Sequence, residues 1–250
     1  VEDTSGVTTI EGLDWGEYKL VETAALDGYS LTGDEYFFTV NADTVENMIE
    51  LSAATDAESL KSGNVITNYR NKLHFIKQSA EETPITLSGG GYRIMKVTEA
   101  DPESREEVSF DTDAAGTGEK KNRLTAGEYI YGLSAGTYEI EELTAPAGYL
   151  KNTTPVVFSI DEYGNITKAD GTAWTDNCVI MQDKSVELSV QKRDADQNLL
   201  LSGAEFSVTG IFATYGNQDA SASTISGLTT DNVKETLKGK LIVSTGETEG

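Results

Sequence analysis

Two lysines of this 250-residue chain fall on the apolar side of a predicted strand, where a charged amine is costly. Side chains alternate along an extended chain, so Lys77 shares a face with Leu73 and Phe75. Lys192 ends a segment of the same pattern over residues 186–192. Apolar surroundings lower the pKa of an amine, which favours the neutral form that acts as a nucleophile.

Two glutamates are predicted to face the same apolar interior. The segments 16–22 and 136–142 each place Tyr, then Leu or Ile, then Glu at alternate positions. Glu22 and Glu142 therefore follow two apolar side chains on one face of a strand. A carboxyl group in such a place must be neutral or paired. It could also pass protons and polarise a carbonyl group beside it.

An amide and a carboxyl group complete the pattern. Asn68 and Asp183 each follow apolar residues on the buried side of a further predicted strand, and their offset equals that between the two lysines. A neutral amine could attack the side-chain carbonyl carbon of Asn or Asp and release ammonia or water, once per molecule. The alternative is ordinary buried ion pairs, or long side chains that reach solvent at strand ends. The two sets are Lys77, Glu142 and Asp183, and Lys192, Glu22 and Asn68.

Four segments carry a resemblance to a known family. Residues 18–29 and 138–149 resemble the E-box of Gram-positive pilins, in which Tyr, Leu or Ile, and Glu alternate ahead of a Gly-Tyr pair. Residues 87–92 and 201–206 both open with Leu-Ser-Gly and resemble the segment that follows the lysine strand of collagen-adhesin B-type (Cna B-type) domains. Leu26 stands where the E-box usually has Pro.

The resemblance to Cna B-type domains of pilins and surface adhesins implies both a fold and a reaction. The fold is a prealbumin-like β-sandwich whose first-strand lysine bonds to an Asn or Asp on the last strand, assisted by the E-box glutamate. By position, Glu142 would assist a bond between Lys77 and Asp183, and Glu22 would assist a bond at Asn68. Asp183 stands where Asn is commoner, so its bond would release water.

Short alternating strands between turn residues predict an all-β fold of tandem Ig-like or prealbumin-like β-sandwich modules. The repeats divide the chain into the C-terminal half of a module at 1–70, a complete module at 71–185 and the N-terminal half of a module at 186–250. Half a sandwich has unpaired edges, so we expect the halves to come together and unite the second set of residues. Three explanations stay open: the chain is circularly permuted, it is cut from a tandem array of repeats, or neighbouring copies complete each other.

Other segments predict further secondary structure or contain groups that could bind a metal. Residues 45–61 and 230–238 are expected to hold short helices, and residues 101–122 to form a polar excursion over the surface. Acidic loops at 161–165 and 194–198 carry oxygen ligands for calcium, but neither has the EF-hand spacing, and turn chemistry explains them better. We therefore expect no metal and no cofactor.

The composition limits the partners and the compartment. A net charge of −23, from 19 basic and 42 acidic residues, disfavours nucleic acid and anionic membranes as partners. Cys178 is the only cysteine, so no internal disulfide can form, and its neighbours favour a small buried hydrophobe. No signal peptide, membrane-spanning run or Leu-Pro-x-Thr-Gly sorting motif stands in the sequence, so we expect a mature or trimmed piece of a secreted cell-wall or pilus protein.

The leading expectation for function is a stalk or pilin-like segment locked by self-catalysed Lys–Asn or Lys–Asp isopeptide bonds, with neighbouring copies or adjacent modules as partners. The alternative is an adhesin module that binds a host protein or glycan through loops, with Trp15 and Trp174 as candidate anchors. A turnover enzyme is not expected. His74 alternates onto the outward face of its strand, and no Ser-His-Asp set or metal-ligand cluster stands out.

Overall fold

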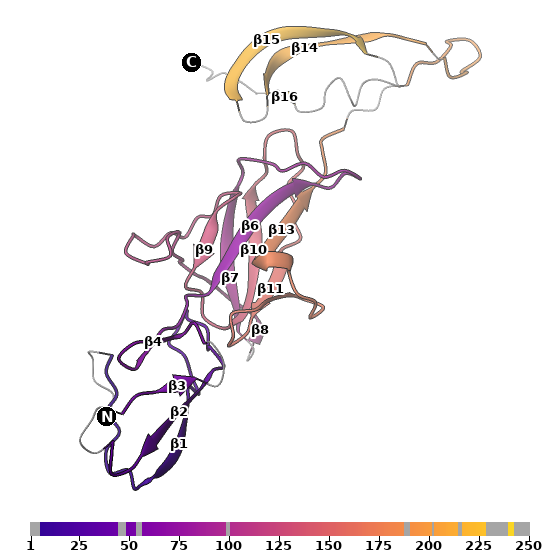
Figure 1. The fold of residues 1–250 in the computed structure, drawn as a ribbon. Helices are drawn as coiled ribbons and strands as arrows, with labels where there is room; N and C mark the ends of the chain where they lie inside the picture. Colours follow the sequence, from indigo (N-terminus) through magenta and orange to yellow (C-terminus); the bar gives the residue numbers. More distant parts are fainter. Residues whose placement is uncertain are drawn as a thin grey trace.

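The protein is described by a computed structural model over residues 6–44, 49–53, 57–98, 101–187, 191–201, 203–214, 217–228 and 240–242. In this part of the chain, the short 3₁₀ turn η1 (Thr175–Asn177) is the only helical element, and the other elements are strands. The strands form three groups that follow one another along the chain (Figure 1). The prediction of an all-β fold is confirmed. None of the helical structure in the described ranges is long and apolar enough to cross a membrane.

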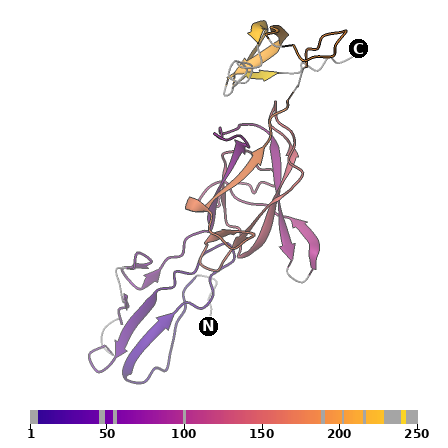
Figure 2. The same ribbon diagram turned by 90° about the vertical axis from the view of Figure 1, so that its right-hand side faces the viewer.

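The first group contains β1 (Gly16–Val21), β2 (Glu35–Val40), β3 (Ser52–Ala53), β4 (Leu60–Lys61) and β5 (Val65–Ile66). The second group contains β6 (Lys72–Ser79), β7 (Gly91–Thr98), β8 (Asp101–Glu107), β9 (Tyr129–Tyr131), β10 (Gly136–Thr144), β11 (Val156–Ile160), β12 (Ile166–Lys168) and β13 (Cys178–Asp183). The third group contains β14 (Phe206–Thr214), β15 (Asn217–Leu228) and β16 (Lys240–Ile242). The first and third groups lie at opposite ends of the second (Figures 1 and 2).

The second group is a sandwich of two sheets. One sheet has the strand order β13-β6-β9, and the other has the order β12-β11-β10-β7-β8. Strand β13 runs parallel to β6, with Val179 opposite Phe75 and Met181 opposite Lys77. The last strand of the sandwich therefore lies beside its first strand, and each carries one member of the first set of residues.

Strand β6 forms because its apolar and polar residues alternate, which suits a sheet with one buried face. Leu73 and Phe75 are buried, whereas Lys72 is exposed. Burying one such side chain contributes about 1.5–3 kcal/mol. The core shared by the two sheets consists of Leu73, Phe75, Tyr92, Ile94, Phe110, Leu124, Ile130, Leu133, Tyr138, Ile140, Phe158, Ile160, Ile166, Val179 and Met181.

The strand pair β1-β2 repeats the geometry of β10-β11. In the first pair Tyr18 lies opposite Phe38 with the rings stacked 5.2 Å apart, and in the second Tyr138 lies opposite Phe158 with the rings 5.4 Å apart. Each tyrosine hydroxyl donates a hydrogen bond to the backbone carbonyl four residues earlier. The internal repeat of the sequence is therefore also a repeat of the structure.

The first group is joined to the sandwich by direct hydrogen bonds. The backbone N–H of Leu31 donates to the carbonyl of Glu162 over 2.8 Å, and the backbone N–H of Asn71, just before β6, donates to the carbonyl of Gly28 over 2.9 Å. The guanidinium of Arg70 forms an ion pair with the buried carboxylate of Asp111. These contacts hold the end of the first group against the loops of the sandwich.

The helices that the sequence predicts at 45–61 and 230–238 have different outcomes. The helix expected over 45–61 is wrong for the described residues, because β3, β4 and the β4-β5 hairpin occupy this stretch. Gly63 and Asn64 adopt positive φ angles of 79° and 59° and so turn the chain back on itself. The helix expected over 230–238 lies outside the described residues. Residues 101–122 begin with β8, which pairs with β7 as a hairpin.

The two acidic loops use their oxygens as turn chemistry requires. The carboxylate of Asp161 accepts hydrogen bonds from the backbone N–H groups of Tyr163 and Asn165. The carboxylate of Asp194 accepts two such bonds from its own loop in the same way. Both aspartates therefore stabilise local turns.

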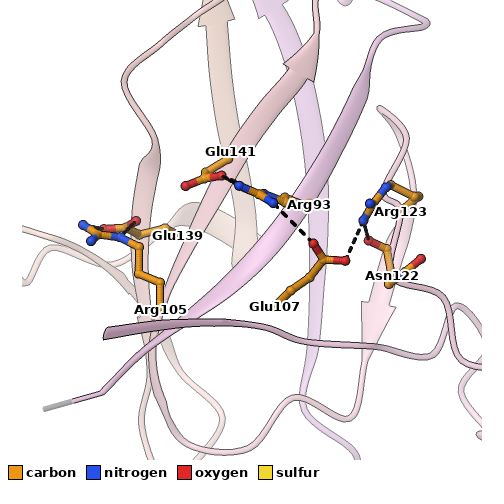
Figure 3. A network of polar contacts seen from close by, with 7 residues as sticks. All are labelled: Arg93, Arg105, Glu107, Asn122, Arg123, Glu139 and Glu141. Atoms are coloured by element: carbon orange, nitrogen blue, oxygen red, sulfur yellow. Dashed lines mark hydrogen bonds and ion pairs between the residues drawn. The ribbon is translucent and has the colours of Figure 1, made fainter. Parts of the chain in front are cut away.

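The outer face of the five-stranded sheet carries a network of ion pairs (Figure 3). Its members come from β7, β8, β10 and the loop before β9: Arg93, Arg105, Glu107, Asn122, Arg123, Glu139 and Glu141. The N···O distance is 2.7 Å from Arg93 to Glu141 and 2.6 Å from Arg123 to Glu107. Exposed pairs of this kind contribute about 0–1 kcal/mol each, so the network supports strand register more than stability.

Candidate cross-linking site

Lys77, Glu142 and Asp183 meet inside the sandwich. The Nζ atom of Lys77 lies 3.0 Å from Oε1 of Glu142 and donates a hydrogen bond to Oδ1 of Asp183. All three side chains are 0% exposed. The structure thus brings together the three groups that the sequence placed on the buried faces of three separate strands.

The strand arrangement explains how these groups meet. Asp183 on β13 lies opposite Ser79 of β6, two residues beyond Lys77, so the lysine and the aspartate share a face as diagonal neighbours. Glu142 reaches them from β10 in the facing sheet, where it lies opposite Tyr92 of β7. The site therefore connects both sheets across the core.

The surroundings of the three groups are aromatic and closed to solvent. The ring centroid of Tyr92 lies 5.5 Å from Nζ of Lys77, and Tyr92 packs edge-on against Phe75 at 4.8 Å. The backbone N–H of Asn152 donates to Oε2 of Glu142 over 2.5 Å. The side chain of Asn152 also donates to the carbonyl of Gln182 over 3.1 Å, which ties the E-box loop to β13.

The charge balance of the site requires one additional proton. One ammonium and two carboxylates would leave a net negative charge on side chains that are fully buried, which is costly. Burial raises the pKa of Asp183, the Lys77 ammonium opposes that rise, and the nearby Glu142 adds to it. Oδ2 of Asp183 is buried and has no hydrogen-bond partner among the described residues. A proton on Asp183 balances the charge of the site.

This arrangement is suited to forming an amide bond. Glu142 can take a proton from Lys77, and the resulting amine lies against the carboxyl group of Asp183. A protonated Asp183 can lose its hydroxyl as water when the amine attacks the carbonyl carbon. Holding the reacting groups at contact distance removes most of the entropic cost of bringing them together.

The second set of residues is only partly assembled. The side-chain amide of Asn68 donates to both carboxylate oxygens of Glu22, over 2.7 and 2.8 Å, and lies 3.2 Å from the carbonyl of Ser30. Glu22 and Asn68 are both half-buried. Lys192 is exposed, and the segment that carries it, between β13 and β14, leaves the sandwich at the end opposite the first group of strands (Figure 1). The structure therefore pairs the glutamate with the asparagine but does not bring the lysine to them.

Lys192 itself lies in a small hairpin. Its carbonyl accepts a hydrogen bond from the N–H of Leu201 over 2.9 Å, and Arg193 forms an isolated bridge with Leu200. The strand predicted over 186–192 is absent from its described positions, and residues 188–190 lie outside the described residues. An exposed lysine in this setting has no apolar core to face.

The other candidate residues have separate surroundings. Trp15 is 71% exposed, whereas Trp174 packs against the core with the Lys168 ammonium 4.8 Å from its ring. His74 stacks on Tyr129 at 4.3 Å. Cys178 is half-buried and not fully buried as expected, and burial raises the pKa of its thiol.

Sequence reasoning missed two members of the site. Tyr92 lies opposite Glu142 on the neighbouring strand, and the N–H of Asn152 donates to Glu142. Neither residue carries a signal in strand alternation that points to a reactive role. Asn152 follows the E-box by a few residues, and its contribution is a backbone N–H that any residue but proline could supply. Tyr92 becomes visible only when β7 and β10 are known to be neighbours.

Comparison with protein families gives a match over most of the chain. The family model described as the SpaA prealbumin-like fold domain matches residues 1–55 and again residues 71–173. None of the curated proteins compared with the chain matches it.

Comparison with solved structures gives distant similarities. The minor pilin GBS52 of Streptococcus agalactiae shares 19% identity over 65% of this chain and 64% of its own, with a TM-score of 0.34. A streptococcal ancillary pilin shares 21% identity over 70% of this chain and 43% of its own, with a TM-score of 0.32. A C-terminal fragment of the pilus adhesin SpaC from Lactobacillus rhamnosus GG shares 19% identity over 72% of this chain and 80% of its own, with a TM-score of 0.30. The chain thus spans less than two thirds of the first two, and TM-scores this low have no bearing on function.

Proposed function

The chain belongs to the family of SpaA prealbumin-like fold domains, and from this premise we propose that it is a load-bearing segment of a surface shaft such as a pilus. Its central module, residues 71–185, would be locked by an isopeptide bond between Lys77 and Asp183. The observation that carries the proposal is the fully buried contact among Lys77, Glu142 and Asp183. Such a group is expensive to bury, and bond formation removes the charges that make it expensive.

The position of the bond suits a module under tension. Pulling force enters at the start of β6 and leaves at the end of β13, and these two strands are parallel neighbours. A bond from Lys77 to Asp183 would carry the force directly from one strand to the other. The two residues are 106 positions apart, so nearly the whole module would be shielded from unfolding under load.

The junction between the first group of strands and the sandwich supports a role in a shaft. The bonds from Leu31 to Glu162 and from Asn71 to Gly28, together with the Arg70–Asp111 pair, join consecutive repeats without a free linker. A stiff junction passes tension from one module to the next.

The reaction would occur once in each molecule. Glu142 would accept the proton of Lys77, and the amine would replace the hydroxyl of Asp183, which leaves as water. Asp183 also lines a surface hollow of about 710 Å³ together with Asn152 and Gln182, which offers the water a short exit. The protein would undergo its own chemistry and would not be an enzyme with turnover.

We extend the proposal to the second set. Glu22 and Asn68 are already paired and lack only an amine. Residues 186–250 would supply it through Lys192, by completing the half-module of residues 1–70. The supplier is a neighbouring copy, an adjacent repeat or the same chain, and the partners of the protein are accordingly further copies or modules.

The mass of the denatured chain tests the proposal. A Lys77–Asp183 bond removes one water, about 18 Da, and a Lys192–Asn68 bond removes ammonia, about 17 Da. A loss of about 18 Da in the intact chain, traced to a cross-linked peptide containing Lys77 and Asp183, is the expected result. A combined loss of about 35 Da would place both bonds in one chain, and multimers that survive denaturation would place the second bond between chains. No loss would contradict the proposal.

A further inference from the structure

The side chain of Arg70 crosses from the first group of strands into the sandwich. Arg70 forms an isolated bridge with Tyr29, and its guanidinium lies 6.0 Å from the centre of the Tyr29 ring, so its backbone belongs to the first group. The guanidinium forms an ion pair with Asp111, which lies in the loop after β8. The side chains of Arg70 and Asp111 are only 15% and 3% exposed, so this contact between the two groups is almost closed to solvent.

The backbone of the sandwich fixes Asp111 beside β9. The N–H of Tyr131 donates to the carbonyl of Asp111 over 2.8 Å, and the N–H of Asp111 donates to the carbonyl of Tyr131 over 3.3 Å. Oδ1 of Asp111 is buried and has no hydrogen-bond partner among the described residues. A buried carboxylate needs a counter-charge, and Arg70 supplies it from the neighbouring group of strands.

Two glycines make room for the guanidinium. A Cβ atom at Gly116 or at Gly132 would overlap the guanidinium of Arg70. Both glycines also have positive φ angles, of +65° and +76°, which disfavour other residues. The N–H of Gly132 in addition donates to the carbonyl of Asn71 over 2.9 Å. Asp111, Gly116 and Gly132 together form an arginine socket on the face of the sandwich that meets the first group.

The next junction of the chain repeats the backbone but not the side chain. After the closing strand β13, Ser185 forms an isolated bridge with Tyr149, as Arg70 does with Tyr29. In both junctions the N–H of the following residue donates over 2.9 Å to the carbonyl of the glycine just before that tyrosine. Ser185 therefore occupies the position of Arg70, and its side chain is short and uncharged.

The buried pair favours one orientation of the junction. Taking two charges out of water offsets most of the attraction between them, so such a pair adds little stability compared with an apolar contact of similar size. Any arrangement that leaves one of the two charges buried alone is strongly penalised. A shift of the first group relative to the sandwich would withdraw Arg70 and leave Asp111 in that state.

We propose that the arginine socket is a docking surface for a preceding module, and that it selects a module with arginine directly after its closing strand. The first group meets this requirement through Arg70. The module of residues 71–185 does not, because it has Ser185 at this position, and a second copy of it would leave the socket without a cation. The socket thereby sets which module precedes another and at what angle. The proposal rests on the shaft function put forward above but not on the cross-link.

The test measures the spread of distances between the two groups of strands by double electron–electron resonance. The full chain carries Cys178→Ala, and spin labels are attached at Thr39→Cys on β2 and Lys168→Cys on β12, which are exposed positions. This labelled parent is compared with Arg70→Ser, Asp111→Ser and the double variant in the same background. Serine is the matched replacement for arginine, because the chain itself uses it at position 185. Circular dichroism establishes that each variant folds.

The parent should give one narrow distance distribution. Arg70→Ser should broaden it about twofold or more, because modules joined through a small polar contact move relative to each other. Asp111→Ser should broaden it to the same extent, and the double variant should broaden it no further, because the two side chains act as a pair. Arg123→Ser removes an arginine of the surface network and should leave the distribution unchanged.

Several results would overturn the proposal. They are an Arg70→Ser or Asp111→Ser distribution as narrow as that of the parent, or a double variant whose broadening is the sum of the two single effects. If Arg70→Ser does not fold because Asp111 is left buried alone, the double variant decides, since it buries neither charge. A broad distribution of the double variant then supports the socket, and a narrow one refutes it.

The outcome for the socket is separate from the outcome for the proposed function. A broad distribution in the parent would refute both the socket and the stiff junction on which the shaft function relies. A narrow parent together with a narrow Arg70→Ser distribution would refute the socket alone. The mass loss of about 18 Da should be the same in the parent and in every variant, because none of the changes touches Lys77, Glu142 or Asp183. Absence of that loss would refute the cross-link without altering the result for the junction.

Discussion

Replacing Glu142 with Gln should leave the module folded and stop the cross-link. Gln has nearly the volume of Glu, and it can still accept the hydrogen bond from the N–H of Asn152. Lys77 and Asp183 remain as a neutral ion pair, so no uncompensated charge is buried. Gln cannot take the proton of Lys77, and the amine stays charged. The Glu142→Gln chain should therefore weigh about 18 Da more than the wild-type chain after the change in side-chain mass is subtracted.

The closed loop sets the size of the stability change. Lys77 and Asp183 are 106 positions apart. In the chain-entropy model, a cross-link that closes a loop of roughly 100 residues stabilises the folded state by about 4.7 kcal/mol. For a domain somewhat above 100 residues each kcal/mol corresponds to about 3–5 °C, so the Tm of the central module should fall by about 15–25 °C.

The assay measures the intact mass of each sample by mass spectrometry and its Tm by differential scanning calorimetry. Glu141→Gln is the matched control, because Glu141 is the next residue, faces outward and binds Arg93 in the surface network (Figure 3). It should link fully and lose no more than about 1 kcal/mol. A Glu142→Gln chain with the linked mass would refute the role of this carboxylate. An unlinked chain with an unchanged Tm would refute the entropic reasoning.

Three further predictions concern pH, the second set and the surface. Burial raises the pKa of Asp183, so its protonated form, which can lose water, persists to a higher pH than in the unfolded chain; the rate of linking after refolding should fall as pH rises through that raised pKa, as a stopped time course of mass loss would reveal. Lys192→Ala should abolish the loss of about 17 Da, or the denaturant-resistant multimers, while leaving the loss of about 18 Da, and a change in both would disprove the independence of the two sets. Arg93→Ala should keep the cross-link and cost about 1–2 kcal/mol in urea unfolding, because its two ion pairs are partly exposed; a larger cost would mean that the network does more than hold strand register.

Much of the central site was accessible to sequence reasoning, because strand alternation is a local property. The period of two residues placed Lys77, Glu142 and Asp183 on the inner faces of their strands, and each of these side chains is buried. The same reasoning put Glu22 and Asn68 on matching faces, and they are hydrogen-bonded to each other. It misjudged residues 45–61, where helix-compatible composition gave way to short strands around the turn at Gly63 and Asn64.

Strand alternation does not show which strands are neighbours, and the assembly of the site depends on that. Only the fold shows that β13 runs parallel beside β6, that β10 faces them from the other sheet, and that Tyr92 of β7 lies opposite Glu142. It also places the segment between β13 and β14, which carries Lys192, at the end of the sandwich opposite the first group of strands. By itself the sequence determined the β class, the repeat and the inward side of each reactive residue. Tertiary structure decided which of these side chains meet and how their charges combine, because both depend on residues brought together from distant strands into the buried interior.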